Sequence, residues 1–160
     1  MKAVLRLLVP TTVLVSLLSS CSPEYHGVHP TSPLPPSQLG SDPRTVDSLR
    51  PTLCWRTGSD KGTRYDLILY AGIRKELDLF SAYYMRGEEV YYREGIEGGS
   101  HRIERPLKSN TVYVWGVRTR SGTNVGPWST YYCQTGYVPI KYVGSRWADG
   151  LWWAFRTPKQ

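Results

Sequence analysis

The side chains that could carry out chemistry are few and are scattered along the sequence. Nucleophilic catalysis needs a base beside a serine or cysteine, and His101 is the only histidine after residue 46. It falls in a predicted strand with Arg102 and Glu104, where we interpret it as an edge residue with structural contacts. Glu88 and Glu89 are adjacent, so on a strand they point to opposite faces and cannot form an acid–base pair. We therefore expect that the protein is not an enzyme.

The sequence also lacks the patterns that hold metals or nucleotides. His26 and His29 are three residues apart, but a metal site needs further ligands on a fixed scaffold, so we interpret them as solvated. The sequence has no glycine-rich phosphate loop and no Cys/His cluster with metal-ligand spacing. We expect no metal and no non-covalent cofactor.

Cys54 and Cys133 are the two cysteines of the chain's body, and Cys21 lies near the amino terminus. In an exported chain they are candidates for a disulfide, which would stabilise by about 3 to 5 kcal/mol through a loop of about 80 residues. Cys54 alternates with Leu53 and Trp55, which should face the core, so its thiol should point outward. The bond therefore requires the segment around Cys133 to lie over that sheet.

Aromatic residues are in surplus, with 12 Tyr and 6 Trp against 2 Phe. A single small domain buries about half of them, and the remainder are either ordinary strand residues or a binding face. Tyr and Trp flanked by Arg are common in protein interfaces and on sugar-stacking surfaces. Our candidate binding aromatics are Trp128, Tyr131, Tyr132 and Trp147.

Length and composition limit the elements that could position these residues. A chain of 160 residues is enough for one compact domain with tails. Apolar residues make up 40% and charged residues 21%, which excludes a membrane bundle and a disordered polyelectrolyte. The formal net charge of +7 falls to +5 without Lys2 and Arg6, and acidic and basic residues alternate in the body. We expect no nucleic-acid partner.

The amino terminus has the shape of a signal peptide. Lys2 and Arg6 are followed by an apolar run over residues 7–18 that is too short to span a bilayer, which takes about 20 residues. The run ends in Leu18-Ser19-Ser20-Cys21, which resembles the lipobox of bacterial lipoproteins. Small residues before the cysteine suit an extended backbone entering a peptidase.

The lipobox resemblance implies that residues 1–20 are removed and that Cys21 is lipidated. Such a cysteine has diacylglycerol on its sulfur and an acyl chain such as palmitate on its new amino group. Each buried CH₂ contributes about 0.8 kcal/mol, so two or three chains form an effectively permanent anchor. Ser22 stands where Asp would favour the inner membrane, which implies the outer membrane. Whether the domain faces the periplasm or the outside stays open.

Residues 21–46 are predicted to be a linker between the anchor and the domain. Six of the twelve prolines lie between residues 22 and 45. Because proline fixes φ and removes a donor, we expect a semi-extended tether of at most roughly 75 Å. Residues 47–160 would then form the domain.

Period-2 alternation in the domain predicts strands with one face on a core. In the clearest case, Tyr113, Trp115 and Val117 share one side of residues 111–120. Two further runs alternate in the same way, Leu53 with Trp55 and Tyr65 with Leu67 and Leu69. Glycines punctuate the runs, as short strands with regular turns require in an all-β sandwich.

The run Leu107-Lys108-Ser109-Asn110-Thr111-Val112-Tyr113, continuing to Trp115, resembles the fibronectin type III pattern, in which Leu and Thr precede a corner tyrosine. Trp55 resembles the tryptophan of that family's strand B. The resemblance covers about 65 residues and implies an immunoglobulin-like, fibronectin type III-like β-sandwich. It implies that Leu107 closes the core and that the Tyr113 hydroxyl bonds to backbone. Asn110 stands for the usual glycine, since Asn tolerates the left-handed region.

Two parts of this scheme are less regular. Ile73, Leu77 and Phe80 have helical spacing, so residues 73–84 are predicted to include a short inserted helix. The last strand is either the segment 125–133 or the apolar segment 151–157. We favour the second, because so apolar a run should close the core rather than hang free.

Two functional hypotheses follow. The first is an outer-membrane lipoprotein whose β-sandwich binds other proteins, as a structural or accessory subunit of a secretion, pilus or surface assembly. The second is a lipoprotein that binds glycan or peptidoglycan through exposed Tyr and Trp. Glycan binding predicts a coplanar array of exposed rings, whereas protein binding predicts an apolar patch or an open edge strand.

Overall fold

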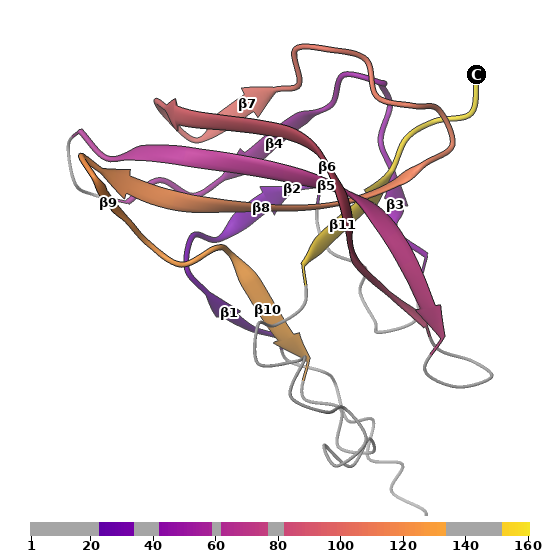
Figure 1. Cartoon of the computed structure of the whole chain (residues 1–160), viewed down its shortest axis with the longest axis horizontal. Coiled ribbons are helices and arrows are strands. Elements are labelled where there is room, and N and C mark those ends of the chain that lie inside the picture. Colours follow the sequence, from indigo (N-terminus) through magenta and orange to yellow (C-terminus); the bar gives the residue numbers. More distant parts are fainter. Residues whose placement is uncertain (1–22, 34–41, 59–61, 77–81, 134–151) are drawn as a thin grey trace, which may run out of the picture.

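The computed structural model describes residues 23–33, 42–58, 62–76, 82–133 and 152–160, which form strands and no helix (Figure 1). The prediction of an all-β protein is confirmed. The described residues therefore contain no helix that is long and apolar enough to cross a membrane. The strands are β1 (Pro23–His26), β2 (Pro30–Ser32), β3 (Arg44–Thr45), β4 (Thr52–Trp55), β5 (Arg64–Glu76), β6 (Ala82–Ile96), β7 (Ser100–Arg102), β8 (Val112–Ser121), β9 (Asn124–Val125), β10 (Thr130–Cys133) and β11 (Trp153–Arg156).

These strands form three sheets. The large sheet has the order β3-β11-β8-β5-β6, with β9 added to β8, and the small sheet has the order β2-β4-β7. β1 and β10 form a separate antiparallel pair. Neighbouring strands are antiparallel except β3 and β11, which are parallel. β5 and β8 lie at the centre of the large sheet, where they pair over eight positions from Arg64↔Arg120 to Ala71↔Tyr113.

The core contains apolar side chains from both the large and the small sheet. Leu53 and Trp55 of β4 are buried, as the alternation predicted, and the Trp55 ring lies 5.6 Å from that of Tyr65. In the large sheet, Leu67 pairs with Val117 and contributes to the same cluster. Its other main members are Leu69, Tyr91, Ile103, Leu107, Tyr113, Trp115, Trp153 and Phe155.

The opposite side of the large sheet, here called the outer face, is also partly buried. A second apolar cluster, the outer cluster, consists of Ile68, Val112, Val114, Trp152 and Ala154. All side chains of β8 from Val112 to Val117 are therefore buried, although they alternate between the two faces. Alternation predicted only the core half of this arrangement.

Two different segments share the second edge of β8. β11 pairs with its first half, from Trp153↔Trp115 to Arg156↔Val112. β9 pairs with its end, and between them Ser129 donates its N–H to the Val117 carbonyl at 2.8 Å and accepts from the Val117 N–H through Oγ at 2.9 Å. The preference for residues 151–157 as the last strand is confirmed for the described part. The segment 125–133 leaves β8 after Ser129 and pairs with β1.

The predicted tether is wrong for residues 23–33. β1 pairs with β10, β2 pairs with β4, and Val28 is buried in the core. β2 is an edge strand, where a proline such as Pro30 is tolerated because its missing N–H faces away from the ladder. β3 likewise adds residues 44–45 to the large sheet. Among the described residues, parts of the predicted linker therefore belong to the sheets of the domain.

The inserted helix is also wrong for the described residues. Ile73 continues β5, and residues 82–84 open β6, with Ile73 paired to Met85 and Arg74 to Tyr84. The β-branched and aromatic side chains of this segment favour cross-strand pairs. Leu77 and Phe80, which suggested the helix, lie outside the described residues.

The expected disulfide is absent, because Cys54 has a free thiol. Cys54 lies in β4, opposite Ser100 of β7, and is half-buried as its alternation with the core residues predicted. Cys133 ends β10, opposite Pro23 of β1. The two cysteines thus belong to different sheets, and the strand that contains Cys133 does not pair with the small sheet.

Candidate functional site

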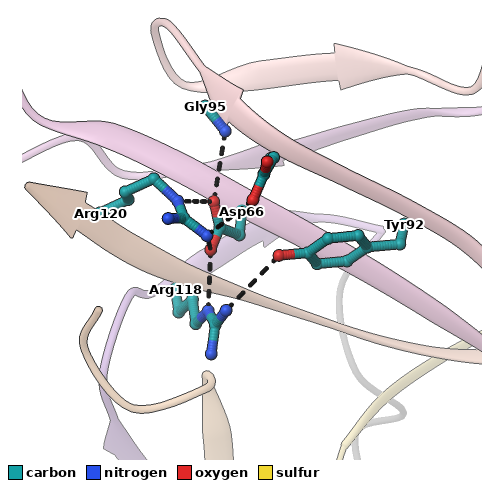
Figure 2. A network of polar contacts seen from close by, with 6 residues as sticks. Asp66, Tyr92, Gly95, Arg118 and Arg120 are labelled. Atoms are coloured by element: carbon teal, nitrogen blue, oxygen red, sulfur yellow. Dashed lines mark hydrogen bonds and ion pairs between the residues drawn. The ribbon is translucent and has the colours of Figure 1, made fainter. Parts of the chain in front are cut away.

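A carboxylate held by two arginines is the most polar feature of the outer face (Figure 2). Asp66 of β5 is fully buried, and its carboxylate accepts hydrogen bonds from Arg118 Nε at 2.9 Å and from Arg120 Nε at 2.6 Å. Arg120 adds a second bond through Nη2 at 2.8 Å, and the Gly95 N–H donates at 3.2 Å. Arg120 also pairs with Glu94 at 2.9 Å. Every oxygen of this carboxylate is therefore paired.

These contacts decide the charge state of the group. Burial opposes ionisation of Asp66, but the hydrogen bonds from Arg120, Arg118 and the Gly95 backbone outweigh it and lower the pKa of the carboxyl below its ordinary value. The same carboxylate raises the pKa of Arg120. The network is ionised at neutral pH and satisfied internally, so it positions Arg118 rather than offering a free group to a ligand.

Beyond Arg118 the outer face continues as a series of stacked cations and aromatic rings. The guanidinium of Arg118 lies 4.4 Å from the centroid of the Trp128 ring, and this ring lies 6.1 Å from that of Trp152. Arg86 lies 5.0 Å from the Trp152 centroid and 5.9 Å from that of Tyr70. The Trp128 and Trp152 planes are tilted by 42°, and Trp152 is buried. The arginines therefore occupy ring faces that a ligand would need.

His101 bridges the two main sheets. Its Nε2 lies 2.7 Å from the Tyr91 hydroxyl, so a strand of the small sheet contacts an edge strand of the large one. Burial lowers the pKa of His101, an effect that the Glu104 carboxylate opposes and Arg93 reinforces. Burial, together with Glu104, raises the pKa of Tyr91. This pairing matches the structural role expected for His101.

The hairpin of β5 and β6 extends past the rest of its sheet. Pairing with β8 ends at Ala71, whereas β5 and β6 continue to pair from Gly72↔Arg86 to Glu76↔Ala82. We call residues 72–76 and 82–86 the arm, and Figure 1 shows it at the lower right, beyond β8. Ile73 and Met85 are opposite each other on one side of the arm, and Ile73 is 46% exposed. An Arg74–Glu76 ion pair of 3.1 Å lies along one strand of the arm.

β6 forms the free edge of the large sheet among the described strands. Its pairing with β5 has three irregularities, each consistent with an extra residue on β6. Its solvent-facing residues include Glu88, Glu89 and Arg93. Bulges and charges of this kind protect an edge against indiscriminate pairing, so the free edge is less suited to binding than the arm.

The structure describes the side chain of only one of the predicted binding aromatics, Trp128. Trp128 belongs to the outer face, whereas the backbones of Tyr131 and Tyr132 lie in β10, opposite Tyr25 and Glu24. Trp147 and Cys21 lie outside the described residues. Sequence reasoning missed Arg118 and Trp152 as partners of Trp128, and Arg86 as a partner of Trp152. Arg118 follows Val117, which faces the core, so alternation along the strand could have placed the Arg118 side chain on the outer face.

The residues that carry the predicted corner pattern do lie together. The Lys108 N–H donates to the Tyr113 hydroxyl at 3.0 Å, and Leu107 is buried in the core. Asn110 has φ of +47°, which confirms the predicted left-handed residue. Thr111 donates its N–H to Thr157 Oγ1 at 2.9 Å, which ties this corner to the segment after β11. Trp55 and Trp115 are both buried in the same core.

Among the described residues, no group of three or more His, Cys, Asp or Glu could hold a metal ion. Comparisons of the chain with protein-family models, with curated proteins and with solved structures give no match. The arguments that follow therefore depend on the residues themselves.

Proposed function

We propose that the chain is an outer-membrane lipoprotein, anchored through acylated Cys21, whose fibronectin type III-like β-sandwich binds other proteins of a cell-envelope assembly. The lipobox-like run Leu18-Ser19-Ser20-Cys21 supports the anchor. Lipid on that cysteine would hold the domain close to the membrane, because β1 begins at Pro23.

Three features support the fibronectin type III-like assignment. The small sheet places β4 beside β7, and the large sheet has the order β11-β8-β5, which matches strands B and E against G, F and C. The Tyr113 hydroxyl bonds to backbone five residues upstream, as a tyrosine corner does. The buried Trp55 of β4 is consistent with the strand B tryptophan.

The observation that carries protein binding is the arm. A two-stranded ribbon is only marginally stable in water, so strands that continue past their sheet need further packing. Tyr83 and Tyr84 of the arm pack against the core and the outer cluster, but Ile73 is left 46% exposed beside half-buried Met85. A partner protein that covers this side would bury apolar surface and stabilise the extension.

Glycan binding, the second hypothesis, receives less support. The described indoles of the outer face, Trp128 and Trp152, are tilted and stacked with Arg118 and Arg86. They do not form the coplanar exposed array that sugar stacking requires. We therefore propose protein binding as the function of this domain.

The test is extraction of the tagged chain from its native host with mild detergent, followed by identification of co-purifying proteins. We expect Ile73→Asp to lose the partner, whereas Val125→Asp keeps it, because Val125 is similarly exposed, at 44%, but lies on β9 away from the arm. The Cys21→Ala variant should no longer be found in the membrane fraction. Retention of the partner by Ile73→Asp would exclude the arm, and unchanged membrane partitioning of Cys21→Ala would exclude the anchor.

A further inference from the structure

A groove of about 500 Å³ is lined by residues of β2, β3, β4 and β7 and by the segment between β3 and β4. Its charged lining residues are Arg44, Arg50, Arg102 and Asp47. Three guanidinium groups against one carboxylate leave the lining with an excess of positive charge. Serine and threonine hydroxyls and two prolines form much of the remainder.

The three arginines of this groove are unpaired. Most described arginines have partners, as Arg118 and Arg120 do with Asp66. By contrast, the side chains of Arg44, Arg50 and Arg102 are exposed and make no ion pair, hydrogen bond or ring contact with any described residue. Three positive charges that line one groove with a single carboxylate, that of Asp47, favour a ligand with several anionic oxygens.

Backbone contacts fix the positions from which these side chains project. Arg102 stands opposite Thr52 in the small sheet, and Arg44 stands opposite Phe155 in the large one. The segment that contains Arg50 is held by two further bonds, from the Ile103 N–H to the Pro51 carbonyl at 3.0 Å and from the Leu107 N–H to the Leu49 carbonyl at 2.8 Å. The Arg50 N–H also donates to Ser48 Oγ at 3.0 Å. Because three anchored elements supply one arginine each, little backbone ordering is needed on binding.

We infer that this groove binds a phosphate group borne by a small polyhydroxylated molecule. Guanidinium forks match phosphate oxygens in pairs, and the hydroxyls can hydrogen-bond to the rest of the ligand. The volume exceeds the space that a bare anion needs and lies within the range of ligand sites, about 300 to 1,000 Å³. The source is either a lipid headgroup or a soluble phosphate ester. The inference does not depend on the proposed protein-binding function, because no residue of the arm lines the groove.

The test is calorimetric titration of the intact chain in a non-ionic detergent with two water-soluble probes. Glycerol 3-phosphate represents a soluble phosphate ester, and glycerophosphoglycerol represents a deacylated lipid headgroup. The double variant R50Q/R102Q removes two groove arginines. The control R64Q/R74Q removes the same charge from exposed ion pairs on β5 with Glu97 and Glu76.

We expect the groove variant to bind at least about tenfold more weakly than the wild type and the control to bind as the wild type does. Tighter binding of glycerophosphoglycerol would assign the site to lipid headgroups, and tighter binding of glycerol 3-phosphate would assign it to soluble esters. Binding of neither probe, or equal loss in both double variants, would overturn the inference. Circular dichroism checks folding, and the single variants Arg50→Gln and Arg102→Gln replace a double variant that does not fold.

Discussion

Trp152 occupies the space over Gly116 so closely that a Cβ atom added there would lie 2.6 Å from Cζ3 of the indole. Gly116 pairs with Ile68, so its missing side chain leaves room for the ring on the outer face of the central strands. The contact connects the segment before β11 to the middle of β8. It also sets the position from which Trp152 meets Trp128 and Arg86.

Replacement of Gly116 tests this contact. Gly116→Ala should displace the Trp152 ring and lower the free energy of unfolding by about 1 to 3 kcal/mol, as overpacking does. Urea denaturation measures the change. Gly58→Ala is the matched control, because no neighbouring heavy atom lies within 4 Å of its added Cβ. Equal losses in the two variants would show that the ring does not depend on the glycine.

Removal of the buried charge should destabilise the large sheet. Asp66→Asn leaves Arg118 and Arg120 without their counter-charge, and we expect a loss of about 3 kcal/mol. This value is at the lower end for a broken buried pair, because the arginine side chains are 20% and 23% exposed. Denaturant unfolding at neutral pH measures it. Glu94→Gln is the control, since Glu94 contacts only Arg120 and is 63% exposed.

The same carboxylate predicts how stability depends on pH. Its folded pKa is lowered from the ordinary value of 3.8, so the folded state holds fewer protons than the unfolded state at acidic pH. The stabilisation is complete above about pH 5 and is lost as the pH falls below 3.8 and through the folded pKa. The advantage of the wild type over Asp66→Asn should shrink in that window. An advantage independent of pH would contradict the assigned ionisation.

The corner hydroxyl gives a fourth prediction. Tyr113→Phe removes the acceptor for the Lys108 N–H while keeping the ring in the core, and should cost about 1 kcal/mol. Thermal unfolding followed by circular dichroism measures the loss. Tyr92→Phe serves as the control, because its hydroxyl is 3.5 Å from Arg118 and the residue is 40% exposed. A loss no larger than that of Tyr92→Phe would remove the corner as a stabilising element.

The free thiol of Cys54 gives a fifth prediction. A disulfide across a loop of this length would contribute about 3 to 5 kcal/mol, so its absence means that a reducing agent should leave the unfolding midpoint unchanged. Cys54→Ser should likewise be near neutral, since the side chain is half-buried and outside the core cluster. Alkylation under native conditions, read by mass spectrometry, should label Cys54. An unfolding midpoint that falls on reduction would show that the disulfide does form.

The sequence predicted those parts of the fold that depend on local pattern. Tyr113, Trp115 and Val117 stand at every second position, and this period of two is sufficient to place their side chains together on the core. Asn110 was predictable because few residues accept a positive φ. The last strand, predicted at residues 151–157, was predictable because so apolar a segment should be buried in the core.

Other parts depend on partners that lie far away in the sequence. The prolines in residues 23–33 restrict the backbone locally. Whether these residues join a sheet depends instead on free edges at β4 and β10. The spacing of Ile73, Leu77 and Phe80 fits a helix. That Ile73 pairs with Met85 and Arg74 with Tyr84 could not be predicted without knowing that the chain returns alongside as β6. The outer cluster was missed because alternation cannot say that both faces are covered. Trp152 covers part of this second face by packing over Gly116, a contact that alternation does not predict.

The position of β11 also determines when the chain can fold. Residues 152–156 supply Trp153 and Phe155 to the core, and they are synthesised after every other described strand. Until they leave the ribosome, half of one β8 edge has no partner and β3 has nothing to pair with. A nascent chain therefore cannot complete the large sheet until residue 156 has been synthesised.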